Sequence, residues 1–238
     1  MLLGLAGTSL ATAQSTPLHY RHSGDMPPGA IGRAQLQRGG PLPGFFQPVE
    51  IKAPRGALVA FASQGNFEPT AATPRRAGLL IGSVYRLKVT EIDGYPGVEV
   101  FPTIEIIDRI YPPPGLEAKF PIPIQLTQDD LVRASEGQMV TRVIYLEDPE
   151  SALPAAEVDG EQYWFDVGPD QDPLLVADTL GRPVAILRMG GLLPGRFGPD
   201  QQFLFGSPPY KPLATIEVIP SPVPSEPLPA VPHELPEP

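Results

Sequence analysis

The chain has 238 residues, enough for one domain with an apolar core, and its 34 prolines and 24 glycines favour short strands and loops over long helices. Its formal net charge of −10 excludes a surface built for nucleic acid or for an anionic membrane, because both require clustered basic side chains. The absence of cysteine excludes disulfides, thiolate catalysis and cysteine-based zinc sites.

The beginning of the chain has the pattern of an export signal. Residues 2–10 form a short apolar run, and Ala11-Thr12-Ala13 fits the small-residue pattern of a signal-peptide cleavage site. No Lys or Arg precedes the run, so the alternative is a frayed end of a cytosolic protein. We predict a signal peptide over residues 1–13, a mature chain that begins near Gln14, and a periplasmic, cell-surface or secreted location. Residues 14–40 are polar and broken by Gly and Pro, and they are predicted to form a flexible arm.

Residues 41–150 are predicted to form an antiparallel β-sandwich. It begins with a hairpin whose strands, residues 45–52 and 57–62, pair around the turn at Ala53-Pro54-Arg55-Gly56.

A second hairpin, over residues 78–111, is the central element of the predicted sandwich. Apolar and polar residues alternate on both sides of a Gly/Pro loop. The alternation favours a register that places Tyr85 opposite Ile106 and Arg86 opposite Glu105.

A strand, a short helix and another strand follow. Residues 120–126 alternate apolar side chains with two prolines, which is typical of an edge or bulged strand. Thr127 has the position of a helix N-cap, and Gly137 that of the residue just after a helix end. Residues 140–146 form the next predicted strand.

Residues 151–195 repeat this order, and they are predicted to add an edge unit or a small subdomain. A short helix lies between strands over residues 161–167 and 183–189. Asp172 is its expected N-cap, and Gly181 is expected to end it in the left-handed conformation.

The chain ends in a proline-rich tail, residues 196–238, which is predicted to be disordered and extended and to serve as a spacer. The alternative for one part is that residues 213–219, in which residues 215–219 alternate, form a last strand that docks on the sandwich.

Four strings carry a resemblance to known proteins: GLLIGSVYRLKVTEI, FPTIEIIDRIYPPPG, TRVIYLEDP and GRPVAILRMGG. Over residues 26–191 the chain resembles a family of uncharacterised exported proteins from planctomycete-type bacteria. The resemblance implies an envelope or extracellular location and no particular activity. The expected fold, a mainly β antiparallel sandwich with two short helices, is similar to immunoglobulin-like and transthyretin-like sandwiches, a likeness that carries no function.

Histidine chemistry is not expected. His19, His22 and His233 all fall in the predicted arm or tail, whereas a Ser-His-Asp relay and most zinc and copper sites need histidine inside the folded domain. The alternative is a weak metal site at His19 and His22 on the arm.

Carboxylates are the remaining candidates for a site. Asp166, Asp170 and Asp172 are spaced so that a loop could turn three oxygens toward one Ca²⁺, although a solvated acidic loop is the simpler interpretation. The carboxylates available to an acid-dependent hydrolase, which needs a facing pair, are Glu105, Asp108, Glu147 and Asp166.

Three functions follow from these observations. The first is a non-enzymatic structural or protein-interaction module of the cell envelope, with no cofactor and no nucleic-acid partner. The second is a glycan- or ligand-binding accessory domain, and the third is the acid-dependent hydrolase. Trp164 is expected in the core, and its exposure to solvent separates the first function from the second.

Overall fold

The computed structural model describes residues 19, 22–148, 164, 166–168, 170–190 and 207–214. The predicted signal peptide, the start near Gln14, most of the strand predicted over residues 161–167, and the tail beyond residue 214 lie outside these described residues.

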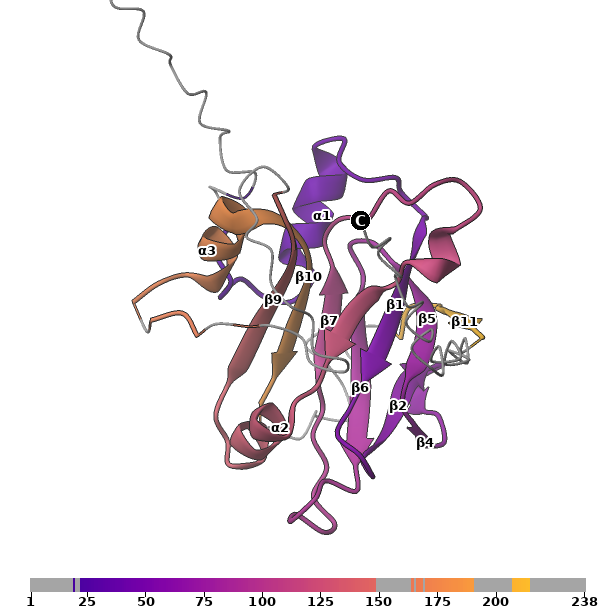
Figure 1. The fold of residues 1–238 in the computed structure, drawn as a ribbon, viewed down its shortest axis with the longest axis vertical. Helices are drawn as coiled ribbons and strands as arrows, with labels where there is room; N and C mark the ends of the chain where they lie inside the picture. The colour runs from indigo at the N-terminus through magenta and orange to yellow at the C-terminus, as the bar shows by residue number, and fades with distance from the viewer. Residues whose placement is uncertain are drawn as a thin grey trace, which may run out of the picture.

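Two β-sheets form the body of the fold (Figure 1). The smaller sheet has the strand order β11 (Lys211–Leu213), β5 (Arg75–Leu80), β1 (Phe46–Lys52) and β8 (Ile122–Gln125). The larger sheet has the order β3 (Asn66–Phe67), β2 (Leu58–Ser63), β6 (Val84–Thr90), β7 (Thr103–Ile106), β10 (Gly181–Met189) and β9 (Val140–Glu147), with β4 (Ala71–Ala72) paired to β2. The prediction of a mainly β fold with two sheets is confirmed. Among the described strand pairs, β1–β8 is parallel and the others are antiparallel.

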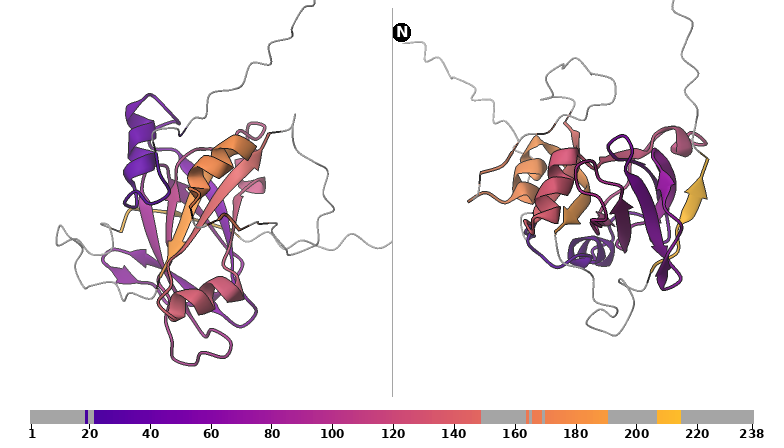
Figure 2. Two further views of the ribbon diagram at one scale, coloured as in Figure 1. Left: turned by 90° about the vertical axis from the view of Figure 1, so that its left-hand side faces the viewer. Right: turned by 90° about the horizontal axis from the view of Figure 1, so that it is seen from below.

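The described residues form three α-helices, one more than predicted, and a short 3-10 helix, η1 (Glu117–Lys119). The α-helices are α1 (Ala30–Gln37), α2 (Gln128–Ser135) and α3 (Pro173–Leu180). The predicted N-caps of α2 and α3 are confirmed, because Thr127 Oγ1 accepts the Asp130 N–H at 3.1 Å and Asp172 Oδ1 accepts the Leu174 N–H at 2.8 Å. Helix α2 lies at the opposite end of the larger sheet from α1 and α3 (Figures 1 and 2).

The apolar core is divided by the larger sheet. The main cluster lies between the two sheets and includes side chains of β1, β5 and β8 on one side and of β2, β6, β7 and β10 on the other. A smaller cluster on the far face of the larger sheet joins Ile31 of α1 and Leu174 of α3 to Ile107 and Ile186. The larger sheet therefore buries both of its faces.

Part of the segment predicted to be a flexible arm is folded instead. Helix α1 lies within it, and Ile31 is fully buried. Gly32 lets the helix approach the turn between β5 and β6 closely, since a Cβ at this position would lie 2.7 Å from the Cα of Gly82. The stretch is polar overall, so its composition does not show that Ile31 is buried or that Gly32 lies close to the backbone of Gly82.

The predicted register of the central hairpin is wrong by two residues. Tyr85 lies opposite Ile104 rather than Ile106, and Val89 forms a bridge with Val100. Two successive turns, in which the Tyr95 N–H donates to the Ile92 carbonyl and the Val98 N–H to the Tyr95 carbonyl, lie in the loop. A slip of two residues keeps every side chain on its predicted face, so the alternation alone could not exclude it.

The first predicted hairpin does not form. The turn is present, with the Ala57 N–H donating to the Pro54 carbonyl at 3.0 Å, but it passes from one sheet to the other. Strand β1 pairs with β5 and β8, and β2 pairs with β3, β4 and β6. Both strands have neighbours on two sides, and a sequence pattern does not say which ones. The prediction that the proline-bearing strand β8 lies at an edge is confirmed.

Strand β10 is neither an edge unit nor part of a subdomain. It lies between β7 and β9, and its last seven residues are all buried. Gly181 begins this strand with φ 170°, which is extended rather than left-handed. Gly181 therefore follows the last residue of α3, as predicted, but the predicted left-handed conformation is wrong. Glycine is required there for another reason, since a Cβ would lie 2.0 Å from the Leu146 carbonyl oxygen on β9.

Residues 207–214 dock on the sandwich instead of forming a spacer. Strand β11 pairs with β5, and Tyr210 stacks on Phe61 with ring centroids 4.6 Å apart. The Tyr85 hydroxyl donates to the Pro209 carbonyl at 2.8 Å. Of the strand predicted over residues 213–219, Leu213 is the last residue of β11, and residues 215–219 lie outside the described part of the chain.

Candidate functional site

A groove of about 490 Å³ runs beside β9, between α2 and α3. Helix α2 contributes Asp130 and Arg133, β9 contributes Arg142 and Tyr145, and α3 contributes Val176 and Ala177. Two segments outside the regular elements complete the wall, one with Asp25 and one with Trp164, Asp166 and Gln171. The lining is mixed: charged and amide side chains lie beside apolar ones, and two aromatic side chains, Tyr145 and Trp164, belong to it.

Trp164 is 53% exposed, so the prediction that it belongs to the core is wrong. Its ring lies over the Arg142 guanidinium, whose central carbon is 5.1 Å from the ring centroid. Such a cation–π contact fixes one side of the ring. Trp164 and Arg142 both line the groove.

The side chain of Arg142 is held in place by Asp130. Its Nε and Nη2 donate to the two carboxylate oxygens of Asp130 at 3.0 and 2.8 Å, and Asp130 is 1% exposed. This two-point contact leaves little freedom to the guanidinium. The capping bond from the Asp130 N–H to Thr127 fixes the first turn of α2. The groove is therefore built on a helix start and a strand rather than on a loop.

The remaining polar groups of the groove include two amides and two exposed carboxylates. Gln171 Oε1 accepts the Gly168 N–H at 3.3 Å, and Gln138 lies near the α2 end. Asp25 and Asp166 are exposed. Burial, and then the nearby Glu147 charge, raise the pKa of Tyr145, so its hydroxyl stays neutral and can both donate and accept.

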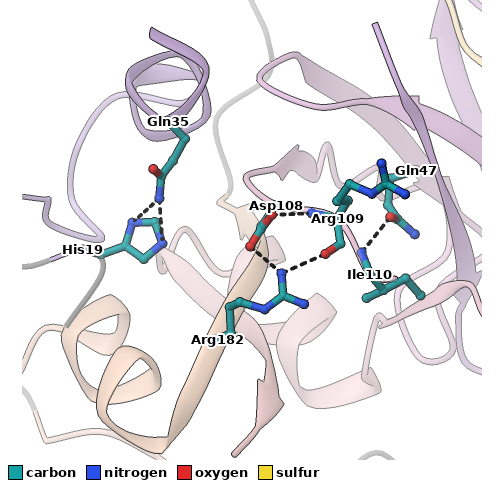
Figure 3. Close-up of polar contacts among 7 residues, drawn as sticks. All are labelled: His19, Gln35, Gln47, Asp108, Arg109, Ile110 and Arg182. Atoms are coloured by element: carbon teal, nitrogen blue, oxygen red, sulfur yellow. Dashed lines mark hydrogen bonds and ion pairs between the residues drawn. The ribbon is translucent and has the colours of Figure 1, made fainter. Parts of the chain in front are cut away.

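The hydrolase candidates are not assembled as a facing pair. Glu105 is fully buried, where it accepts the Gly32 N–H of α1 at 2.8 Å and pairs with Arg188 at 3.1 Å. Asp108 is bound by Arg182, which also donates to the Arg109 carbonyl (Figure 3). The other two candidates, Glu147 and Asp166, lie exposed, and the groove is lined by Asp166 alone of the four.

The three calcium candidates have different surroundings. Asp172 accepts the Gly24 N–H and caps α3, whereas Asp166 and Asp170 are exposed. Within the described residues, no three histidine or acidic side chains come together as a metal-binding group. The sequence spacing thus reflects a helix cap with two acidic residues before it.

Two of the histidines lie inside the fold, which corrects their assignment to an exposed arm. His19 is fully buried and His22 is 6% exposed. Their Nδ1 atoms are 3.1 Å apart, and the Gln35 amide of α1 lies over the His19 ring (Figure 3). His233 lies outside the described residues. No sequence pattern signals this burial, because it depends on α1 and α3 closing over the segment.

Comparison of the chain with protein-family models, with characterised proteins and with solved structures finds no match. In the part of the chain that is described, no helix is long and apolar enough to span a membrane. The groove is therefore interpreted from its own chemistry.

Proposed function

We propose that the protein is a non-enzymatic, exported binding module of the cell envelope that holds a glycan in the groove along β9. One observation carries the proposal: the single tryptophan of the chain lies half-exposed in a groove whose lining combines charged, amide and hydroxyl groups with apolar side chains. The exported location rests on the signal-like N-terminus and on the resemblance to exported planctomycete-type proteins. An immunoglobulin-like topology is part of the same proposal.

A sugar fits this combination of groups better than an apolar ligand does. The C–H face of a pyranose ring packs against an aromatic ring, and its hydroxyls need donors and acceptors around their edge. Arg142, Gln138 and Gln171 supply donors, while Asp25 and Asp166 supply acceptors. A groove open along a strand also accepts a chain rather than a single ring.

Two alternatives fit the groove less well. A purely structural envelope module gives the exposed indole no role, and a hydrolase needs two facing carboxylates. Glu105, Asp108 and Asp130 each pair with an arginine, which gives these carboxylates positioning rather than acid–base roles. Binding without catalysis is therefore the function that the groove supports best.

The test uses the one tryptophan as a reporter. We expect soluble oligosaccharides from envelope or plant-type polysaccharides to change the intrinsic fluorescence, and we expect calorimetry with Trp164→Ala to show at least tenfold weaker binding. Tyr111→Ala is the matched control, because Tyr111 is 66% exposed and is not part of the groove. Equal affinity of the Trp164→Ala variant and the parent, or binding to peptides but to no glycan, would contradict the proposal.

A further inference from the structure

The two buried histidines lie in a segment of the chain whose described hydrogen bonds reach α1, α3 and β10. The backbone N–H of His19 donates to Asp178 Oδ2 of α3 at 2.6 Å. The next anchor is Gly24, whose N–H donates to both oxygens of Asp172 at 3.0 Å and whose carbonyl accepts from Arg188. This docked segment, His19 together with residues 22–26, therefore lies across α3 and β10.

Only one proton can lie between the Nδ1 atoms of the two imidazoles. With the Nδ1 atoms 3.1 Å apart, one nitrogen must donate and the other must accept. His22 Nε2 is also buried, and no hydrogen-bond partner faces it among the described residues. A proton added to either ring places a positive charge in a site closed to water, and protonation of both rings places two such charges side by side, which low-dielectric surroundings strongly disfavour.

Charged groups of every surrounding element face the pair. Helix α3 presents Asp178, β7 presents Glu105, and Asp108 follows β7. Arg38 at the end of α1 adds a positive charge near both rings. Glu105 and Asp108 are already paired with Arg188 and Arg182, so their charges are partly compensated.

We propose that the His19–His22 pair is a pH-sensitive latch that keeps the docked segment on α3 and β10 at neutral pH and releases it in mild acid. The proposal does not depend on the ligand of the groove. It concerns a local opening, because the docked segment precedes α1 in the chain and its release leaves both sheets intact.

The direction of the effect follows from proton linkage. Burial, and then the neighbouring His22, lower the pKa of His19 to about 4, against a smaller opposing effect of Asp108 and with a further lowering by Arg38. Burial and Arg38 also lower the pKa of His22, against Asp178 and Glu105. The pKa of a released imidazole is about 6.5, so protons bind the released form more tightly than the docked form. Docking is at full strength above this pH and weakens as the pH falls toward 4.

The size of the effect follows from the same linkage. Between pH 7.5 and pH 5.0, His19 alone lowers the ratio of docked to released segment about 30-fold. His22 acts in the same direction. This change is large enough to convert a segment that is docked nearly all of the time into one that is often free.

The composition of the chain offers a clean measurement. It contains no cysteine and one tryptophan, and Asp25 and Trp164 line the same groove. A bimane dye on the variant Asp25→Cys is quenched when it lies near Trp164. We expect quenched fluorescence at pH 7.5 and a several-fold reversible increase on acidification, with a midpoint between pH 6.5 and 4, while far-UV circular dichroism stays unchanged.

Two further variants decide whether the histidines cause the response. His19→Asn with His22→Asn places amide nitrogens near the Nδ1 positions without a titrating ring, and it should abolish the pH response. His233→Asn is the control and should preserve it. A flat signal in the parent, a response that survives the double substitution, or loss of circular dichroism over the same pH range would each overturn the latch.

The double variant could release the segment at every pH and so give a flat signal for a trivial reason. Imidazole titration of the unlabelled parent by NMR covers this case. The latch requires that two of the three histidines titrate below pH 6.5, and three ordinary titrations would refute it.

Discussion

The two faces of the larger sheet are buried by different means. On the face toward the smaller sheet, β7 contributes Ile104 and Ile106 to an apolar core. On the other face the same strand contributes Thr103 and Glu105, which bind Arg188, and Glu105 also accepts the Gly32 N–H of α1. All four residues of β7 are buried. In an alternating strand, a polar residue therefore shows which face of the sheet its side chain is on, but it does not show that this face is exposed to solvent.

The largest expected effect comes from breaking the charge pair on the helix-covered face. Glu105→Ala leaves Arg188 buried without its partner and removes the acceptor of the Gly32 N–H. We expect a loss of about 4 kcal/mol in the free energy of unfolding, measured by urea denaturation. The control Glu99→Ala, at a partly exposed pair with Lys88, should cost less than about 1 kcal/mol.

A second variant shows whether that cost is due to charge. Replacing both partners, with Glu105→Leu and Arg188→Met, should recover most of the stability, because two compatible apolar groups need no compensation. If the double variant is as unstable as Glu105→Ala, the hydrogen bond to α1 rather than the ion pair holds this face.

A slightly smaller effect is expected on the apolar face. Leu87 is fully buried in the cluster between the sheets, and Leu87→Ala should cost about 3 kcal/mol through lost burial and a residual cavity. The cost should be the same at low and high salt, whereas screening acts on charged groups. A salt-dependent penalty for Leu87→Ala would mean that the two faces are not independent.

This difference between the faces also explains what the sequence could predict. Alternation correctly assigned Tyr85 and Leu87 to the core, and local cap chemistry correctly located the starts of α2 and α3. The strand partners, the exact register of the hairpin formed by β6 and β7, and the burial of His19 depend on contacts that local patterns in the sequence do not specify. The groove was missed for the same reason, since Arg142 and Trp164 meet only after β9 has paired with β10.

The pairing of β9 with β10 gives the next prediction. A methyl group on Gly181 would lie 2.0 Å from the Leu146 carbonyl oxygen, so the two strands would have to separate locally. We expect Gly181→Ala to cost about 2 kcal/mol by overpacking. Hydrogen exchange should report weaker protection at the start of β10 and unchanged protection in β6. Unchanged stability would mean that the strands do not meet at this residue.

The smallest expected effects compare the two helix caps, one for each face. Thr127 caps α2, whose Leu131 and Ala134 belong to the core between the sheets, and Thr127→Ala should cost about 1 kcal/mol. Asp172 caps α3 over the polar face and also accepts the Gly24 N–H. Asp172→Ala should therefore cost more, about 2 kcal/mol.

The two caps should also differ in their response to pH. Burial alone would raise the pKa of Asp172, but hydrogen bonds from Ser23, Gly24 and the first turn of α3 outweigh it and hold that pKa below its usual value. A lowered carboxyl pKa stabilises the fold above about pH 4 and loses this effect as the pH falls further. The penalty of Asp172→Ala should thus shrink between pH 7 and pH 3.5 in urea denaturation, while that of Thr127→Ala stays constant. Equal and constant penalties would show that the charge on Asp172 does not contribute, and that the two faces differ in their buried pairs but not in their caps.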